Sequence, residues 1–199
     1  MTGAAVPGGA PPGDRLEAAA DFLADASALK DTLRSGFTPG GRPESVAEHS
    51  WRLGLLALVL SGEMEGIDLA RLLSLILVHD LGEAISGDVP AIDQVPGEDR
   101  AARERTDLMT LCAPLPEDAR ARIVALWDEY AAAATPEAVM AKGLDKCETM
   151  LTHAEGANPP DFDYAWNLGY GSEATARSPL LAALRKVVDV RTRARMAEG

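Results

Sequence analysis

The stretch from Leu72 to Asp88 constrains the chain most, because a run of apolar residues there ends abruptly in charged side chains. The run closes at Val78 and is followed directly by His79 and Asp80. Burying an imidazole next to a carboxylate costs several kcal/mol unless each group finds a partner, and one divalent cation satisfies both. The stretch therefore predicts a metal site.

Composition favours a single all-α domain. The 199 residues are 47% hydrophobic, which is enough for a sizeable core in one domain. Aromatic residues make up only 5% of the chain, and the alternating Val, Ile and Thr runs typical of strands are scarce. We therefore expect nearly all of the chain to be helical.

Charge and cysteine content narrow the function classes. A formal net charge of -12 would repel polyanions, so binding to a nucleic-acid polymer or an anionic membrane is disfavoured. A small phosphate ligand stays compatible, because one local cation can override the global field. Neither a secretory signal nor an apolar stretch of about 20 residues is found, so a cytoplasmic protein is expected. Cys112 and Cys147 have no CxxC spacing and are expected to be core side chains.

The N-terminal part is expected to be a leader followed by one helix. Residues 1–13 hold only small residues, Gly and Pro, which predicts a disordered leader before a domain spanning 14–199. Apolar residues at mostly helical spacing predict a helix from Asp14 to about residues 34–36. The Gly- and Pro-rich segment 35–43 is expected to be a loop.

A capping box announces the next helix. Ser45 at the N-cap and Glu48 three residues later would satisfy two free backbone donors reciprocally. This places His49 in the first turn of a helix that is apolar from Leu53 onward and is expected to stop near Gly62.

The central core helix is expected to begin after Asp68, which can serve as its N-cap. The sequence LARLLSLILVHDLGEAI is apolar almost all round, so the helix should be buried. His79 and Asp80 would lie at its C-terminal end, with Glu83 one turn beyond them and Asp88 in the turn that follows.

The rest of the chain is expected to hold two outer helices, one inner helix, an irregular tail and a last helix. Caps and helix breakers set these bounds. The expected segments are residues 99–111, a helix starting at Pro116, a helix N-capped by Thr135 that carries Asp145, the loop-and-turn tail 156–178, and a helix from Pro179 to Arg195.

Three of these helices offer two imidazoles and two carboxylates. We refer to His49, His79, Asp80 and Asp145 as the four candidate ligands. Two nitrogens and two oxygens suit Mn²⁺, Co²⁺, Fe²⁺ or Zn²⁺ and leave positions open for water and substrate. Taken singly, a histidine in a first helical turn is more often a surface or hydrogen-bonded residue, so the whole pattern carries the prediction.

This pattern resembles the H…HD…D signature of HD-domain phosphohydrolases. From about Leu29 to Leu151 the chain is similar to the small HD-domain 5′-deoxynucleotidases, through the motifs PESVAEHSWRLGLLALVL, HDLGEAISGD, LWDEY and TPEAVMAKGLDKCETM. The resemblance implies a bundle of five to six core helices in which the four candidate ligands hold one divalent metal ion. It also implies hydrolysis of 2′-deoxynucleoside 5′-monophosphates, usually by homodimers and often best with Co²⁺ or Mn²⁺.

The small number of histidines favours a single metal ion. The chain contains 3 histidines, too few for the dinuclear sites of HD-GYP phosphodiesterases or HD-fold diiron oxygenases. The third, His153, lies eight residues after Asp145 on the same helix. It is expected to be an exposed or core histidine rather than a ligand.

Two further carboxylates match functional positions of the family. Glu83 corresponds to a catalytic glutamate, which chemistry requires to orient the attacking water or to move its proton. Asp88 corresponds to a second functional carboxylate near the sugar and the water. The alternatives are a solvated acid at a helix end for Glu83 and a turn-forming residue for Asp88.

Substrate recognition is expected to involve an arginine. Arg34 stands at the spacing of the family's phosphate-binding arginine, and a guanidinium can bind two phosphate oxygens. Arg42 is its rival, with an exposed loop cation as the alternative. Bacterial members carry Trp after this arginine to exclude a ribose 2′-hydroxyl, whereas this chain has Ser35, so sugar selectivity is open. Phe37 is a candidate for the same role.

The tail and the reaction itself have open alternatives. The aromatic residues Phe162, Tyr164 and Trp166, with Asn167, could line a base pocket or simply pack the last helix. The predicted function is metal-dependent hydrolysis of a phosphate monoester, a (deoxy)nucleoside 5′-monophosphate. The alternatives are hydrolysis of another small phosphate ester and nucleotide binding without turnover.

Overall fold

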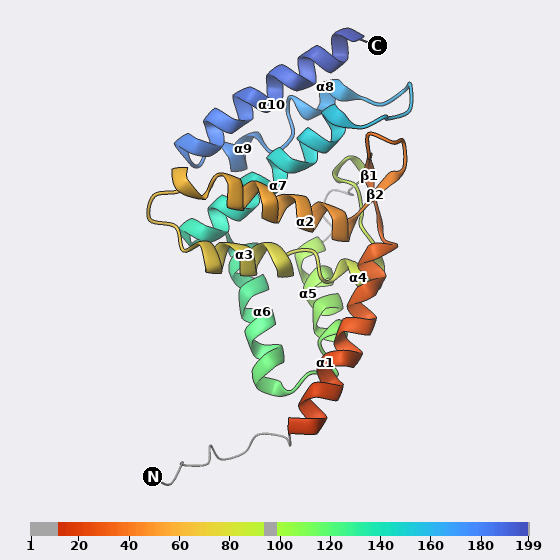
Figure 1. Cartoon of the computed structure of the whole chain (residues 1–199), viewed down its shortest axis with the longest axis vertical. Coiled ribbons are helices and arrows are strands. Elements are labelled where there is room, and N and C mark those ends of the chain that lie inside the picture. The colour runs from red at the N-terminus through yellow and green to blue at the C-terminus, as the bar shows by residue number, and fades with distance from the viewer. Residues whose placement is uncertain (1–11, 94–98, 199) are drawn as a thin grey trace.

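A computed structural model describes residues 12–93 and 99–198, and helices dominate it (Figure 1). The α-helices are α1 (Pro12–Ala26), α2 (Val46–Val59), α3 (Leu69–Val78), α4 (Glu83–Ser86), α5 (Arg100–Leu111), α6 (Glu117–Ala132), α7 (Pro136–Glu155), α8 (Tyr164–Asn167), α9 (Ser172–Thr175) and α10 (Pro179–Glu198). Short 3-10 helices are η1 (Ser27–Lys30), η2 (Ser61–Glu63) and η3 (Ala91–Asp93), and two strands are β1 (Leu33–Phe37) and β2 (Pro43–Ser45). The predicted all-α class is confirmed.

Helix α7 is the centre of the bundle. It packs against α2, α3, α6 and α10, and Figure 1 shows α10 on one side of it with α2 and α3 on the other. Most of its inner face is buried, including Leu144, Cys147 and Met150 at 0% exposure. A helix covered on several sides is held rigidly by its neighbours, which suits it to carry functional side chains.

The predicted helix starts are confirmed where capping chemistry is clear. Ser45 and Glu48 form both bonds of the capping box of α2. The side chain of Asp68 accepts a hydrogen bond from a backbone N–H in the first turn of α3. The side chain of Thr135 accepts one from the first turn of α7, in which Pro136 is the first residue. These side chains satisfy backbone donors that have no partner inside the helix.

The N-terminal region differs from the prediction. The first helix starts at Pro12, two residues early, and ends at Ala26, while residues 1–11 of the expected leader lie outside the described residues. The segment expected as helix end and loop forms an antiparallel hairpin of β1 and β2 instead. Gly36 lies so close to α7 that a Cβ there would be 2.8 Å from Thr152 Cγ2. Because this segment is covered, strand pairing satisfies backbone groups that a loop would leave unpaired.

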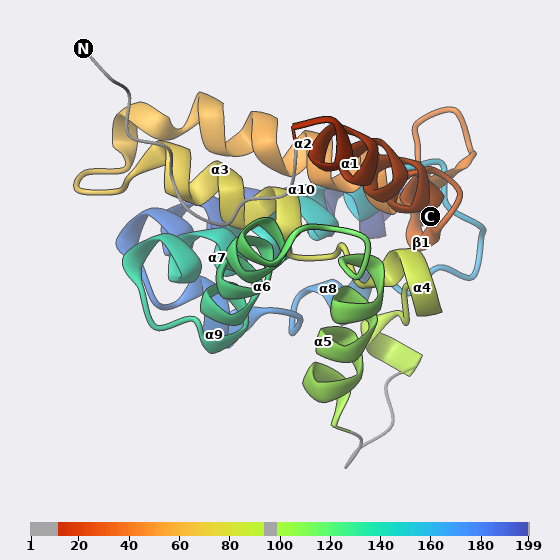
Figure 2. The same ribbon diagram turned by 90° about the horizontal axis from the view of Figure 1, so that it is seen from below.

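The central helix is also shorter than expected. It ends at Val78, and α4 begins at Glu83 after a turn. Gly82 in this turn presses on α5, since a Cβ there would be 2.7 Å from the Glu104 carbonyl oxygen. Figure 2 shows α4 beside α5. The carbonyl of His79, freed by the end of the helix, accepts a hydrogen bond from Trp127 Nε1 at 3.0 Å.

Two smaller corrections concern the outer elements. Helix α6 is not peripheral, because it packs on α3 and α7 and buries Trp127 to 4% exposure. The tail expected as loop contains the short helices α8 and α9, and the last helix continues to Glu198. Among the described helices, none combines the length and apolarity that crossing a membrane requires.

Candidate metal centre and adjoining pocket

Three buried side chains from different elements point to one place. His49 comes from the first turn of α2, His79 from the C-cap of α3 and Asp145 from the middle of α7. Each of them offers a ligand atom, and these atoms all lie within 4.8 Å of one another. The end of α3 after Val78 therefore directs the imidazole of His79 toward α7.

The two imidazoles have unused nitrogens. His49 Nε2 and His79 Nε2 are buried, and neither makes a hydrogen bond of acceptable geometry. His49 Nε2 lies 3.2 Å from Asp145 Oδ1, so nitrogen and carboxylate face one another. Buried polar atoms without a partner are costly, and a divalent cation between them removes that cost. The residues therefore fit one divalent cation.

The fourth candidate ligand lies at the edge of this group. Asp80 Oδ2 is 3.0 Å from His79 Nε2 and 3.9 Å from His49 Nε2. Burial raises the pKa of Asp80, but the opposing effects of the nearby His79 and Arg34 are larger. The pKa of Asp80 therefore lies below its usual range. Asp145 likewise keeps a low pKa against the effect of burial, with Lys146 Nζ at 2.8 Å from its Oδ2. The structure thus brings all four predicted residues together, with both carboxylates ionised.

A carboxylate that sequence reasoning missed fixes the first histidine. Glu148 contacts His49 Nδ1. Arg52 Nε lies 3.0 Å from Glu148 Oε1, and Thr152 donates to the same atom. A proton on Nδ1 shared with Glu148 leaves Nε2 free to face a cation, as in many metal sites. Glu148 lies three residues after Asp145 and so on the same face of the helix, and this spacing could have identified it from the sequence.

The second histidine is held by backbone. His79 Nδ1 lies 2.7 Å from the carbonyl oxygen of Ile76, which fixes the tautomer with Nε2 directed at the site. Burial and Arg34 lower the pKa of His49, yet Asp145 and Glu148 outweigh them and raise it to about 9. A cation at Nε2 would take the place of that proton, so metal binding is coupled to proton release.

Glu83 and Asp88 lie beside the candidate ligands. Glu83 is buried, and its Oε2 has no hydrogen-bond partner. Burial, with repulsion from Asp80 and Asp88, raises the pKa of Glu83 to about 10. Burial also raises the pKa of Asp88 above its ordinary value. Two carboxyl groups with raised pKa values beside a cation site are suited to accept and return protons.

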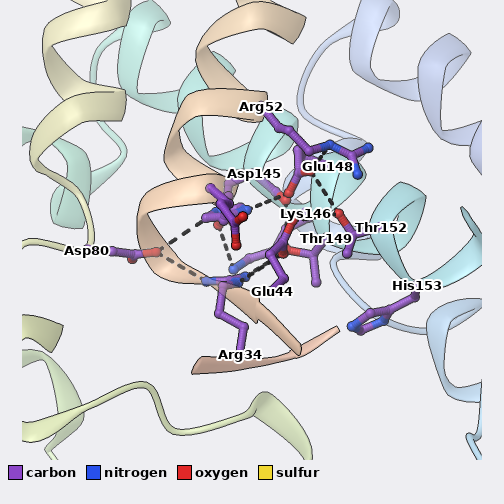
Figure 3. A network of polar contacts seen from close by, with 12 residues as sticks. Arg34, Glu44, Arg52, Asp80, Asp145, Lys146, Glu148, Thr149, Thr152 and His153 are labelled. Atoms are coloured by element: carbon purple, nitrogen blue, oxygen red, sulfur yellow. Dashed lines mark hydrogen bonds and ion pairs between the residues drawn. The ribbon is translucent and has the colours of Figure 1, made fainter. Parts of the chain in front are cut away.

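A pocket of about 240 Å³ lies beside the candidate metal centre, and we call it the charged pocket. Asp80, Asp88 and Asp145 line it, as do the cations Arg34, Arg100 and Lys146. Figure 3 shows Arg34 between Asp80 and Thr149. Its Nη1 is 3.3 Å from Asp80 Oδ2, and its Nη2 donates to Thr149 Oγ1 at 3.1 Å. The three cations are charged hydrogen-bond donors from which the oxygens of a phosphate group can accept.

The structure separates the two rival arginines. Arg34 lies in the charged pocket, whereas Arg42 is exposed in the hairpin and pairs with Glu48 on the surface. Phe37 does not line the charged pocket but a neighbouring, less polar one. His153 is buried and lines both pockets, so it is a core histidine next to the site and not one of the grouped ligands. Sequence reasoning did not single out Lys146 or Arg100.

Comparison with known proteins agrees with this geometry. The HD-domain family matches residues 26–184. The chain is 36% identical over 136 residues to the human 5′-deoxynucleotidase HDDC2, and this alignment covers 67% of this chain and 66% of the human protein. It is 38% identical over 136 residues to the bovine 5′-deoxynucleotidase HDDC2, covering 67% and 65% of the two chains. The chain therefore spans just under two thirds of the length of these relatives.

A solved structure extends the similarity to the whole domain. The crystal structure of a predicted metal-dependent phosphohydrolase from Magnetospirillum magnetotacticum MS-1 superimposes with a TM-score of 0.74 at 31% sequence identity. The alignment covers 90% of this chain and 96% of the other. Since the family match also includes the three helices that carry the candidate ligands, this chain belongs to the HD-domain family.

Proposed function

We propose that this protein is a metal-dependent phosphohydrolase that converts nucleoside 5′-monophosphates to nucleoside and phosphate. The observation that carries the proposal is the pair of unpartnered imidazole nitrogens, which face two ionised carboxylates beside a pocket with three cations. The relatives named 5′-deoxynucleotidases support the choice of a nucleotide substrate.

The residues divide the chemistry between them. Arg34, Lys146 and Arg100 bind the phosphate oxygens and stabilise the negative charge that grows on them. A divalent cation held by the four candidate ligands would supply Lewis-acid activation of the phosphate and the water. Co²⁺, Mn²⁺, Fe²⁺ and Zn²⁺ all suit the nitrogen and oxygen donors of the site.

The reaction breaks one bond and forms one. A water oxygen bonds to phosphorus while the bond between phosphorus and O5′ breaks, with the attacking and leaving oxygens in line. Asp88 takes up the proton that the water loses, and Glu83, which holds a proton at neutral pH because its pKa is raised, gives that proton to the leaving O5′. Their raised pKa values favour this transfer, because a group that must hold a proton needs a sufficient affinity for it.

The test is phosphate release from a panel of deoxy- and ribonucleoside 5′-monophosphates, with protein reloaded with Co²⁺ or Mn²⁺. We expect Asp80→Ala to lose at least about 1,000-fold in kcat/KM, because removing a ligand removes the cation. Asp21→Ala, at an exposed position of α1, is the matched control and should behave like the wild type. Equal phosphate release by wild type and Asp80→Ala would contradict the proposal. The same panel reads the preference between deoxyribose and ribose.

Assembly and location belong to this proposal as well. We propose a homodimer, supported by exposed apolar side chains on α2, among them Trp51 at 65% and Val59 at 76% exposure. Light scattering on the wild type and on Trp51→Glu tests it, with a monomeric wild type as the contradicting result. We also propose a cytoplasmic location, supported by the free, buried Cys112 and Cys147, which cell fractionation tests.

A further inference from the structure

A second pocket continues from the charged pocket. Its volume is about 350 Å³, and we call it the aromatic pocket. The two pockets share five lining residues, namely Ser35, Pro90, Ala91, His153 and Trp166. The two pockets therefore adjoin along these residues, so a molecule with its phosphate among the cations of the first pocket has the second pocket as its nearest neighbour.

The lining of the aromatic pocket is different in kind. Phe37, Phe162 and Trp166 are aromatic, and Ile92 and Pro159 add apolar surface. All three aromatic side chains are half-buried, so part of each side chain is accessible to a ligand. Flat apolar walls of this kind favour a planar ring, through stacking or edge contacts.

A buried arginine, Arg185, fixes the segment that carries Trp166. Arg185 of α10 is 8% exposed, and its guanidinium donates to three carbonyl oxygens at the end of α8 and just after it. The acceptors are Asn167 at 3.1 Å, Leu168 at 2.7 Å and Tyr170 at 2.6 Å. The Trp166 ring also stacks on Tyr170, with centroids 4.5 Å apart. A wall fixed in this way needs little ordering when a ligand binds.

His153 is a second fixed part of the lining. Its Nδ1 lies 2.9 Å from Asn167 Oδ1, so Nδ1 donates and the ring cannot turn freely. Phe162 meets the imidazole edge-on, with centroids 4.9 Å apart. His153 Nε2 lies 3.4 Å from Ser35 Oγ at the junction of the two pockets. Burial lowers the pKa of His153, which favours the neutral ring with Nε2 as an acceptor.

The order of chemistry along the two pockets is cations, then a polar pair, then aromatic walls. A nucleoside 5′-monophosphate has the matching order of phosphate, sugar hydroxyls and planar base. We propose that the aromatic pocket is a nucleobase subsite in which Phe162 and Trp166 contact the base, while Ser35 and His153 face the sugar. This inference rests on the proposed function, and it assigns the tail 156–171 to substrate choice.

The test compares a nucleotide with the same phosphate ester lacking its base. The substrates are thymidine 5′-monophosphate and 2-deoxyribose 5-phosphate, and the readout is the ratio of their kcat/KM values. We expect Phe162→Ala to lower this ratio about tenfold, the usual size of a base-stacking contribution. Leu23→Ala, which removes an apolar side chain of α1 that is 67% exposed, is the control and should keep the wild-type ratio. The ratio is independent of how much of each variant is folded.

A second measurement separates this inference from the proposed function. Thymidine, which has no phosphate, is tested for binding to wild type and Phe162→Ala by ligand-observed NMR in the presence of a chelator. Binding to the wild type that weakens in the variant supports the subsite, even if no phosphate ester is hydrolysed. Hydrolysis of both esters with a ratio near one, or a ratio that Phe162→Ala leaves unchanged, overturns the inference while the hydrolase assignment stands. Absence of thymidine binding together with absence of turnover overturns both.

Discussion

The charged pocket and the aromatic pocket adjoin, but the protein builds them in different ways. The charged pocket is lined mainly from β1, the turns on either side of α4, α5 and α7, and its charged side chains lie next to the unpartnered imidazoles of the candidate metal centre. The aromatic pocket takes all but one of its aromatic rings other than His153 from the segment after α7, and hydrogen bonds from Arg185 to backbone carbonyls hold that segment in place. The difference separates chemistry from choice of substrate, because every phosphate monoester needs the first pocket and only a ring needs the second.

The two pockets also differ in their electrostatics. The chain carries a formal net charge of -12, yet Arg34, Arg100 and Lys146 gather at the charged pocket. Arg34 pairs with Asp80 and Lys146 pairs with Asp145 of the candidate metal centre. The opposite charges favour the ionised form of each partner when no substrate is bound. In the aromatic pocket the shared His153 is neutral and hydrogen-bonded. Substitutions in the first pocket should therefore affect all substrates equally, and those in the second should change ratios between substrates.

The largest effect is expected from Glu83→Gln. The substitution keeps the shape of the side chain but removes the acidic proton that Glu83 gives to the leaving oxygen, so kcat should fall about 1,000-fold. The loss should be the same for thymidine 5′-monophosphate and 2-deoxyribose 5-phosphate, because proton transfer does not involve the base. Metal content, measured by elemental analysis, should stay at the wild-type level. A loss that differs between the two substrates would contradict the separation of the pockets.

A smaller effect is expected from Arg34→Ala. This guanidinium lies in the charged pocket, and its removal should lower kcat/KM about 100-fold for both substrates, largely through a higher KM. Arg42→Ala is the matched variant, since Arg42 is exposed and pairs with Glu48. It should stay within about twofold of the wild type, because a surface ion pair contributes little. A larger loss in Arg42→Ala than in Arg34→Ala would reverse the assignment of the phosphate-binding arginine.

The stability of metal-free protein should depend on pH through Glu83. Its pKa is raised from 4.5 to about 10, so the folded state holds this proton more tightly than the unfolded chain. That contribution is complete below about pH 4.5 and is lost as the pH rises toward 10. Between pH 5 and pH 8 the wild type should therefore lose roughly 4 kcal/mol relative to Glu83→Gln, at about 1.36 kcal/mol for each pH unit. Urea unfolding in the presence of a chelator measures this, and the same trend in the exposed variant Glu65→Gln would show that Glu83 is not its source.

Sequence reasoning predicted most of the charged pocket, for a physical reason. His79 and Asp80 follow an apolar run, where uncompensated charge is unfavourable, and caps such as Ser45 and Thr135 mark helix starts through local hydrogen bonds. Such signals depend on neighbours in sequence, and they place side chains on known faces of helices. The grouping of His49, His79 and Asp145 then follows from packing three amphipathic helices together.

The features that were not predicted depend on contacts distant in sequence. The β1–β2 hairpin replaces the expected helix end and loop because Gly36 meets Thr152 of α7, and no local pattern announces this contact. The break after Val78 likewise depends on Gly82 pressing against α5 and on Trp127 binding the carbonyl of His79. Arg185 resembles an ordinary surface residue in the sequence, and only the fold reveals that it is buried.

Arg185 also provides the smallest and most selective prediction. Its guanidinium binds three carbonyls behind Trp166, and methionine cannot replace these bonds although it fills similar space. Arg185→Met should therefore leave the wall of the aromatic pocket less ordered and lower the ratio of kcat/KM for thymidine 5′-monophosphate to that for 2-deoxyribose 5-phosphate about threefold to fivefold. Because a ratio cancels the concentration of active protein, the measurement tolerates a partly unfolded variant. If Arg185→Met is destabilised but keeps the wild-type ratio of the two kcat/KM values, Arg185 supports the fold and not the nucleobase subsite. The proposed structural difference between the two pockets would then be wrong.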